Sequence, residues 1–289
     1  MVVHSQDCIP LCKLLYMQKL KLAIIDMNDG RANQGMRCIR SIVQQYMHVV
    51  DVKEFDTRAK CEIPDENYDI YISSGGPGDP RIGDGIWDKA YYNLIDKLWG
   101  HNSKNPKKKK YVFFICHSFQ MACLHFNLAS VTKRKSTSFG VQPVHKTKDG
   151  EDSELFFGLD DPFYVVESRD YQIVQPNIHI FKEHGASILA LEKIRTHVQY
   201  ERAIMAVKFS DEFYGTQFHP EADPQGMIYH FGMDENKEKV IANFGQEKYL
   251  SMMEHLTDPD KIELTFNTIL PRFIEMAVQH LHSRQLQPA

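Results

Sequence analysis

Cys116 is the residue of this sequence whose position most strongly suggests chemistry. It ends the apolar segment 111–116 (YVFFIC), and a segment with helical character begins near Ser118. A thiol between a buried strand and a helix N-terminus lies at the positive end of the helix dipole, which favours the thiolate. The exposed amides of that turn could also hold a developing oxyanion. The competing interpretation is a buried core cysteine, because most lone cysteines in intracellular chains are packing residues.

A histidine and a glutamate about a hundred residues later could complete a catalytic set. In the stretch 213–223 (FYGTQFHPEAD), an apolar strand is expected to end at His219, and Pro220 fixes the backbone after it. His219 could serve as the general base for Cys116, and Glu221 could orient the imidazole and stabilise its charged form. A His-x-Glu pair alone is weak evidence, so the order of all the segments has to be considered together.

Alternating strand and helix patterns indicate how these residues are positioned. An apolar run such as LAIIDM is typical of a strand buried on both faces of a parallel sheet. The alternation implies right-handed crossovers and an open, doubly wound, mostly parallel α/β sheet flanked by helices, with functional residues at the carboxyl ends of its strands. The loop 75–78 (GGPG) and Cys116 both lie at such ends. The first expected strands span 22–27, 49–55, 69–80 and 111–116, and the third of them breaks into the glycine-proline loop. The expected helices span 33–46 and 87–99, and a further helix begins at about 118. A β-rich middle region follows, and then strands at 203–209 and 213–219.

The composition is that of an ordinary globular protein. A chain of 289 residues with 43% hydrophobic residues can bury a sizeable core, and a net charge of −4 predicts neither nucleic-acid nor membrane-surface binding. The Lys107–Lys110 run could dock an acidic partner, but a solvated loop is the favoured interpretation. The cysteines are too sparse for a disulfide scaffold, so we expect reduced thiols in a cytoplasmic protein. They are Cys8, Cys12, Cys38, Cys61, Cys116 and Cys123.

Residues 1–18 are expected to form an N-terminal extension. Pro10 and Lys13 interrupt its apolar patch, and no apolar run of the chain reaches the roughly 18–20 residues that a membrane-spanning helix needs. Cys8 and Cys12, even with His4 nearby, lack further obvious ligands. We therefore expect neither a metal site nor a cofactor.

Three segments, taken in order, resemble class I glutamine amidotransferases, the Cys-His-Glu enzymes that release ammonia from glutamine. They are SSGGPGDP, FICHSFQ and GTQFHPEAD, with weaker matches at 138–144 (SFGVQPV) and 167–176 (ESRDYQIVQP). The resemblance runs from about Leu20 to Asp223 and implies the flavodoxin-like fold of that family. Within that family, the sequence is similar to the amidotransferase domain of GMP synthetase.

The resemblance implies a role for each matching residue. Cys116 would attack the side-chain amide carbon, His219 would carry the proton to the leaving ammonia, and Glu221 would hold His219. Water would then hydrolyse the γ-glutamyl thioester to glutamate. The backbone amides of Gly76 and His117 would form the oxyanion hole, and the candidate substrate contacts are Gly75, Gln120, Ser168 and Arg169.

Two features near Cys116 leave alternatives open. The family elbow reads Gly-x-Cys-x-Gly, whereas Phe114 and Ser118 flank the cysteine here, so that either the elbow is repacked or its geometry has drifted from glutamine hydrolysis. Ile-Cys-His also resembles the elbow of PfpI-type peptidases, where the histidine directly after the cysteine is the base. In that interpretation the ring of His117 would be catalytic, and the downstream His-Pro-Glu would have no role.

The expected domains are the extension 1–18, an amidotransferase-like domain 19–223 and a helical C-terminal extension 224–289. Helical patterns at 237–244, 247–255 and 259–280 could pack on the sheet, cover the active-site edge or form a dimer contact. The resemblance is compatible with three alternative functions. The chain could be a glutaminase subunit that feeds ammonia to a separate synthetase, a stand-alone γ-glutamyl hydrolase or transferase, or a degenerate non-catalytic member of the family.

Overall fold

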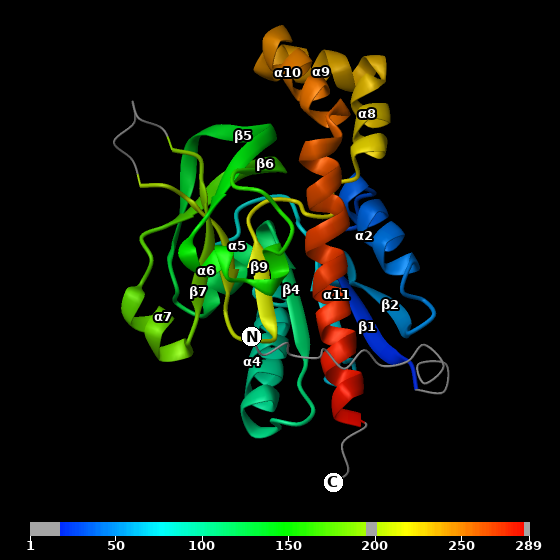
Figure 1. The fold of residues 1–289 in the computed structure, drawn as a ribbon, viewed down its shortest axis with the longest axis vertical. Coiled ribbons are helices and arrows are strands. Elements are labelled where there is room, and N and C mark those ends of the chain that lie inside the picture. Colours follow the sequence, from blue (N-terminus) through cyan, green and yellow to red (C-terminus); the bar gives the residue numbers. More distant parts are fainter. Residues whose placement is uncertain (1–17, 195–200, 286–289) are drawn as a thin grey trace, which may run out of the picture.

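One mixed sheet of nine strands organises residues 18–194 and 201–285, the part of the chain that this computed structural model describes (Figure 1). The strand order is β2-β1-β3-β4-β9-β8-β7-β5-β6; the first five strands run parallel, and the remaining pairings are antiparallel. The strands are β1 (Leu20–Asp26), β2 (Val50–Asp56), β3 (Ile70–Ser73), β4 (Tyr111–Ile115), β5 (Ser130–Lys146), β6 (Phe163–Val174), β7 (Ser187–Glu192), β8 (Ile204–Lys208) and β9 (Phe213–Thr216).

Helices cover both faces of the sheet, which confirms the predicted doubly wound α/β class. β1 shows why: Leu22 and Ile24 enter one core, whereas Ala23 and Ile25 enter the core on the opposite face. The helices are α2 (Gln34–Gln44), α3 (Thr57–Lys60), α4 (Trp87–Lys104), α5 (His117–His125), α6 (Lys148–Glu151), α7 (Ile178–His184), α8 (Pro224–Gly232), α9 (Asp234–Phe244), α10 (Gln246–Thr257) and α11 (Leu264–Gln285). α2 and α11 supply one core, and α4 and α5 supply the other.

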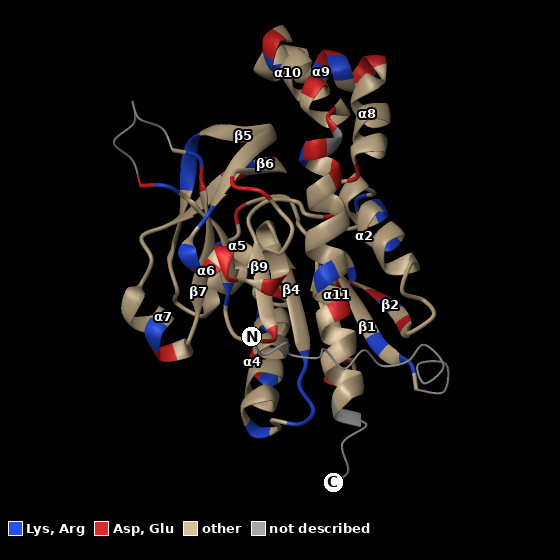
Figure 2. Cartoon of the chain, viewed as in Figure 1, with Lys and Arg blue, Asp and Glu red and all other residues tan. Residues whose placement is uncertain are grey.

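The lysine run 107–110 leads into β4 and is visible as a blue segment in Figure 2. Lys109 Nζ lies 3.5 Å from a carboxylate oxygen of Glu212, and Lys110 Nζ lies 3.6 Å from that of Asp69. Two of the four lysines are therefore paired within the chain rather than solvated, which corrects the expectation of a simple solvated loop.

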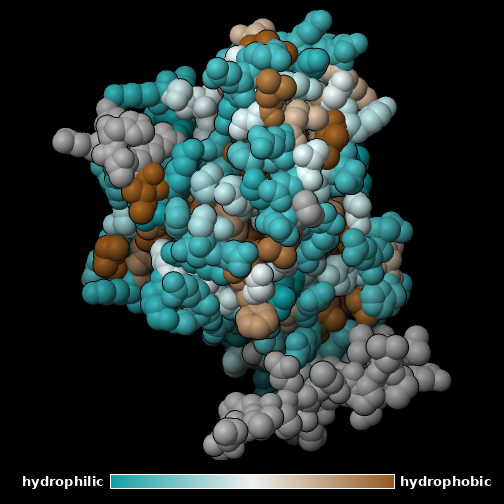
Figure 3. Space-filling view, turned by 45° about the horizontal axis from the view of Figure 1, so that its top comes forward, coloured by the Kyte–Doolittle hydropathy of each residue, from teal (hydrophilic) through white to brown (hydrophobic). Residues whose placement is uncertain are grey.

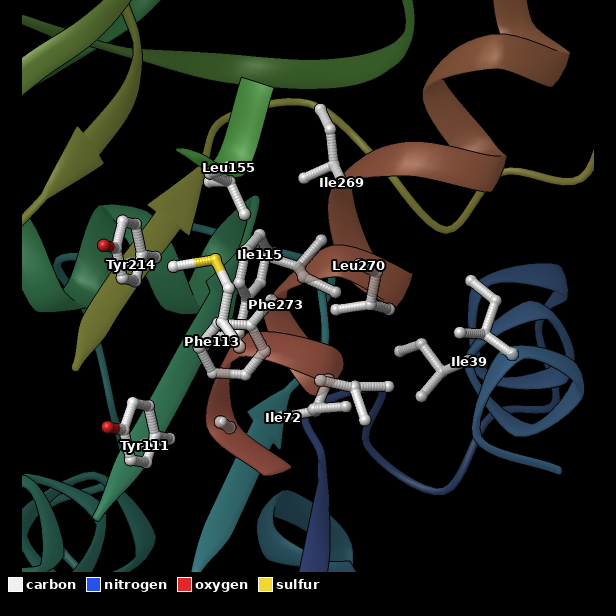
Figure 4. Packing of buried hydrophobic residues seen from close by; sticks show 14 of the residues in the cluster. Ile39, Ile72, Tyr111, Phe113, Ile115, Leu155, Tyr214, Ile269, Leu270 and Phe273 are labelled. Atoms are coloured by element: carbon white, nitrogen blue, oxygen red, sulfur yellow. The ribbon is translucent and has the colours of Figure 1, made fainter. Parts of the chain in front are cut away.

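The C-terminal segment is helical, as predicted, but its helices pack in two different places. α11 crosses the sheet and packs into the core formed with β1, β3 and β4 (Figures 1 and 4). Its Phe273 is fully buried, with its ring centroid 5.0 Å from that of Phe113. α8, α9 and α10 pack together at one end of the molecule against β5 and β6, around a third cluster that includes Phe231 and Met252.

Figure 3 shows a mostly hydrophilic face, with hydrophobic side chains in small scattered groups. No helix among the described residues is long and apolar enough to cross a membrane. Nor does any group of three or more potential metal-binding side chains gather there. Cys8, Cys12 and His4 lie outside the described residues.

Replacing Phe273 by alanine tests whether α11 shares the main core. Loss of a fully buried aromatic ring should lower the free energy of unfolding by about 3–5 kcal/mol, measured by urea denaturation. Leu250→Ala on α10 is the control, because that side chain is 55% exposed and should change stability little. A Phe273→Ala variant as stable as the control would show that α11 is not part of the core.

Candidate active site

The backbone at Cys116 adopts a conformation that side chains other than glycine rarely occupy. Its φ is 48° and its ψ −98°, at the N-cap of α5 directly after β4. Such a conformation costs on the order of 1–3 kcal/mol and persists only where the surroundings fix it. Here the amide of Cys116 donates to the carbonyl of Thr216 on β9 at 2.8 Å, and its carbonyl accepts from the amide of Gln120 at 3.0 Å. The thiol is therefore presented on a sharp strand-to-helix turn.

Ser118 braces this turn from within. Its buried hydroxyl accepts a hydrogen bond from the amide of Ile115 at 2.9 Å and lies 2.9 Å from the carbonyl of Ser73 on β3. A glycine at this position, as in the family elbow, could make neither contact. Serine therefore fits the turn and ties β3 to it.

Phe114 is accommodated by a glycine on the neighbouring strand. Its ring is 1% exposed and packs near Phe209 and Phe213, on the face of the sheet covered by α4 and α5. Gly215 pairs directly with it across β4 and β9; a Cβ on Gly215 would lie 2.5 Å from the Phe119 ring and 3.2 Å from the Cβ of Phe114. The sheet thus makes room for the bulk of Phe114 through Gly215 on β9.

His219 and Glu221 are hydrogen-bonded to each other. The Nδ1–H of His219 donates to Oε1 of Glu221 at 2.8 Å, which leaves Nε2 for another partner. β9 ends at Thr216 rather than at His219 as predicted, because the chain leaves the sheet there. The amide of His219 instead donates to the carbonyl of Val166 at 3.0 Å, in an isolated bridge to β6. This bridge brings the imidazole over the end of β4.

Buried charge controls the protonation of His219. Burial alone would lower the pKa of its imidazole, but the carboxylate of Glu221 and the neighbouring Cys116 together raise that pKa well above its ordinary value. Glu221 is 1% exposed, and its Oε2 has no hydrogen-bond partner among the described residues. Its Oε1 faces the first turn of α2, where a Cβ on Gly35 would lie 3.1 Å away. A protonated imidazole beside a thiol stabilises the thiolate.

Two glycines let the backbone of the loop 75–78 approach these groups. A Cβ on Gly75 would lie 2.9 Å from Cε1 of His219 and 3.5 Å from the Cβ of Cys116. A Cβ on Gly76 would lie 2.3 Å from the carbonyl oxygen of Met27. Arg58 holds the loop by donating to the carbonyl of Pro77 at 2.6 Å. Neither glycine can carry a side chain without moving its neighbours.

A pair of glutamines lies behind the thiol. Nε2 of Gln120 donates to Oε1 of Gln217 at 3.0 Å, and Nε2 of Gln217 lies 3.8 Å from Sγ of Cys116. Gln120 was predicted as a substrate contact, a role that stays a prediction, and one N–H of its side-chain amide is used by Gln217. Gln217 was not predicted as a site residue, although it lies inside the GTQFHPEAD motif.

A family model described as glutamine amidotransferase class-I matches residues 23–231. The chain belongs to this family. No curated protein matches the sequence closely enough to count as a relative. The match includes the glycine loop, Cys116 and the His219–Glu221 pair, and it ends within α8.

Solved structures support the amidotransferase fold. A glutamine amidotransferase from Thermotoga maritima superposes with a TM-score of 0.61 at 18% identity, covering 91% of this chain and 100% of that chain. A glutamine amidotransferase from Methylobacillus flagellatus gives a TM-score of 0.61 at 14% identity, covering 94% and 97% of the two chains. A putative GMP synthase subunit from Thermoplasma acidophilum gives 0.51 at 16% identity, covering 93% and 98%.

A cavity of about 600 Å³ opens over Cys116 in this amidotransferase. The predicted site residues all border it: Gly75, Gly76, Cys116, His117, Gln120, Ser168, Arg169, His219 and Glu221. α8 also borders it, through Met227, His230 and Phe231. The C-terminal segment thus reaches the active-site edge, one of the placements that the sequence left open, although the sequence patterns did not identify α8 as a helix.

Arg169 lies in the cavity wall with its guanidinium already engaged. Nε donates to Glu167 at 2.9 Å and an Nη2 hydrogen to Glu192 at 3.3 Å, and the side chain is 1% exposed. Ser168, by contrast, is exposed at the cavity. The geometry therefore offers Ser168 to a ligand, whereas the Arg169 side chain braces β6. Substrate contact by either residue stays a prediction.

The ring of His117 differs from that of His219. Burial, together with the positive charge of Arg58, lowers the pKa of His117 to about 4, so its ring is neutral at neutral pH. Its Nε2 is buried and finds no hydrogen-bond partner within the described residues. Cys116 raises the pKa of His219 and has no such effect on His117.

The electrostatic coupling predicts how Glu221→Gln changes His219. In the wild type, the imidazole should titrate above the ordinary value of about 6.5, as followed by NMR of the ring carbons. Removing the carboxylate charge removes the electrostatic stabilisation of the imidazolium, so the titration midpoint of His219 should move down by about one to three pH units. Glu183→Gln, on exposed α7, should leave the midpoint in place. An unchanged midpoint in Glu221→Gln would show that Glu221 does not set the charge of His219.

Proposed function

We propose that this amidotransferase hydrolyses the side-chain amide of glutamine through a thioester on Cys116. The observation that carries the proposal is the thiol on a strained turn beside a histidine whose Nδ1 is held by a buried glutamate. The strained elbow holds Cys116 at the border of the cavity, although only 6% of the residue is exposed. An imidazole whose charge is stabilised by Glu221 can accept the thiol proton and return it. Glutamine hydrolysis to glutamate and ammonia needs these two properties.

The reaction proceeds in two halves. The thiol proton of Cys116 first passes to His219 Nε2, and Sγ then attacks the γ-carbon as a thiolate beside the imidazolium. The resulting oxyanion would be held by the backbone amides of Gly76 and His117, both bordering the cavity. The C–N bond then breaks, and His219 returns the proton to the departing ammonia. A water molecule, deprotonated by His219, cleaves the thioester and releases glutamate.

The geometry favours this mechanism over its alternatives. A peptidase of the PfpI type would need the ring of His117 as base, but a pKa of about 4 makes that ring a weak base, and Cys116 is coupled to His219 instead. A degenerate member was considered because of Phe114, whose bulk is accommodated opposite Gly215. Both arguments support a working Cys116–His219–Glu221 set.

We further propose that the ammonia serves a synthetase on a separate chain. The similar structures include a putative GMP synthase subunit and the glutaminase domain of the Trypanosoma brucei CTPS with bound acivicin. Of the cysteines in the described residues, Cys38, Cys61, Cys116 and Cys123 are all free thiols, which fits a reducing compartment such as the cytoplasm. No cofactor is required by the proposed chemistry.

Turnover of glutamine tests the proposal directly. With enzyme in excess over isotopically labelled glutamine, wild-type protein should release labelled glutamate even if a partner is needed for full speed. Cys116→Ala should lower the single-turnover rate by on the order of 10³-fold or more, because the nucleophile is lost. Cys123→Ala, a second buried cysteine seven residues further along the chain in α5, should retain the activity. Equal rates for Cys116→Ala and wild type would refute the mechanism.

A further inference from the structure

α8 presents one side of a short helix to the cavity over Cys116. Met227, His230 and Phe231 occupy positions i, i+3 and i+4, which share a helix face, and all three border the cavity. Tyr229 projects elsewhere and is 71% exposed. The sequence of α8, PQGMIYHFG, contains no acidic or basic side chain apart from its histidine. The wall that it forms is therefore mainly apolar.

The wall formed by Met227, His230 and Phe231 lies on the same side of the cavity as His219. The carbonyl of Val166 accepts the amide of His219, and Ala222 follows His219 by three residues. Val166, Ala222 and Phe231 belong to one buried apolar cluster, with Met227 packed against it. A group leaving from the His219 side would therefore meet this apolar surface.

The position of α8 is fixed at both ends. At its start, the Asp223 carboxylate accepts the amides of Gln225 and Gly226 at 3.0 and 3.1 Å and also accepts from Arg37 of α2 at 2.8 Å. At its end, the hydroxyl of Tyr249 donates to the carbonyl of Phe231 at 3.2 Å. The ring of Phe231 also packs edge-on against Phe139, with centroids 5.8 Å apart. The wall is preformed, as binding surfaces for small molecules usually are.

The chemistry of the proposed function places the leaving group against this wall. His219 must deliver its proton to the departing nitrogen, so any substituent on that nitrogen extends along the His219 side. Free ammonia has no substituent and leaves the apolar surface unused. A cavity of about 600 Å³ falls in the range of pockets that bury drug-sized ligands, which is more room than glutamine needs.

Resting on the proposed function, we propose that this site also hydrolyses γ-glutamyl amides of primary amines, and that among these amides it prefers those with an apolar substituent. Glu221 is paired with His219 and Asp223 with Arg37, so neither of these carboxylates is free to pair with a cationic substituent at the wall. In the reaction, Cys116 forms the thioester and the C–N bond breaks. The primary amine departs with the proton from His219, and water then yields glutamate and the free thiol.

Three amides distinguish the proposal from simple glutaminase activity. Glutamine, γ-glutamyl methylamide and γ-glutamyl benzylamide differ in the leaving-group substituent alone, and glutamate release is measured for each. The kcat/KM for the benzylamide should exceed that for the methylamide by about tenfold or more, the discrimination that an apolar pocket gives for a few buried carbons. A wild-type enzyme that cleaves the benzylamide no better than the methylamide would overturn the inference.

Variants of α8 test whether the wall is responsible. Phe231→Ala should reduce the benzylamide-to-methylamide ratio of kcat/KM by at least about fivefold, since the ring no longer covers the substituent. Met227→Ala, at a less buried position, should also reduce this ratio. It provides a second test of the wall if Phe231→Ala folds poorly. Tyr229→Ala on the exposed side should leave the ratio unchanged. A ratio unaffected by both cavity variants would overturn the inference.

Failure of the proposed function and failure of this inference give different results. If none of the three amides yields glutamate in the wild type, the proposed function fails, and the inference that rests on it fails too. If glutamine is hydrolysed and the methylamide is cleaved as fast as or faster than the benzylamide, the proposed function stands, and the assignment of an apolar leaving group is refuted.

Discussion

The strained backbone of Cys116 is the constraint on which the rest of this site depends. A φ of 48° at a residue with a side chain is unfavourable by itself, so the neighbouring elements must outweigh it. β9 accepts its amide through Thr216, β3 is tied to the turn by the Ser118 hydroxyl, and α5 begins directly after it. The parallel half of the sheet thus holds one thiol in a position that an unconstrained chain would avoid.

The remaining parts of the site fit around that turn. The loop with Gly75 and Gly76 can lie close to it because neither residue carries a side chain that would strike His219 or Met27. His219 reaches the thiol because the chain leaves β9 early and bridges to Val166. The buried carboxylate of Glu221 lies beside α2 and keeps a positive imidazole favourable in a position where burial alone would neutralise it. Packing and electrostatics therefore act on the same few atoms.

The sequence predicted the strand-turn-helix unit at Cys116 because apolar runs and helix signals are local. It also predicted the α/β class and the resemblance to class I glutamine amidotransferases, which the solved structures and the family match respectively bear out. The sequence could not show that the absent side chain of Gly215 makes room for Phe114. The two residues lie about a hundred positions apart and come into contact only through the pairing of β4 with β9. The engagement of Arg169 with Glu167 and Glu192, and the approach of α8 to the cavity, likewise depend on contacts that spacing does not encode.

The most direct test of the account is covalent trapping of Cys116 by a diazoketone analogue of glutamine, followed by intact mass and peptide mapping. A nucleophile held on a strained turn beside a charged imidazole should give a single adduct on Cys116, with Cys38 and Cys61 unmodified. Cys116→Ala protein should remain unmodified, and Glu221→Gln protein should react more slowly at neutral pH. An unmodified wild type, under conditions that label another amidotransferase, would contradict the account, as would an adduct on a different cysteine.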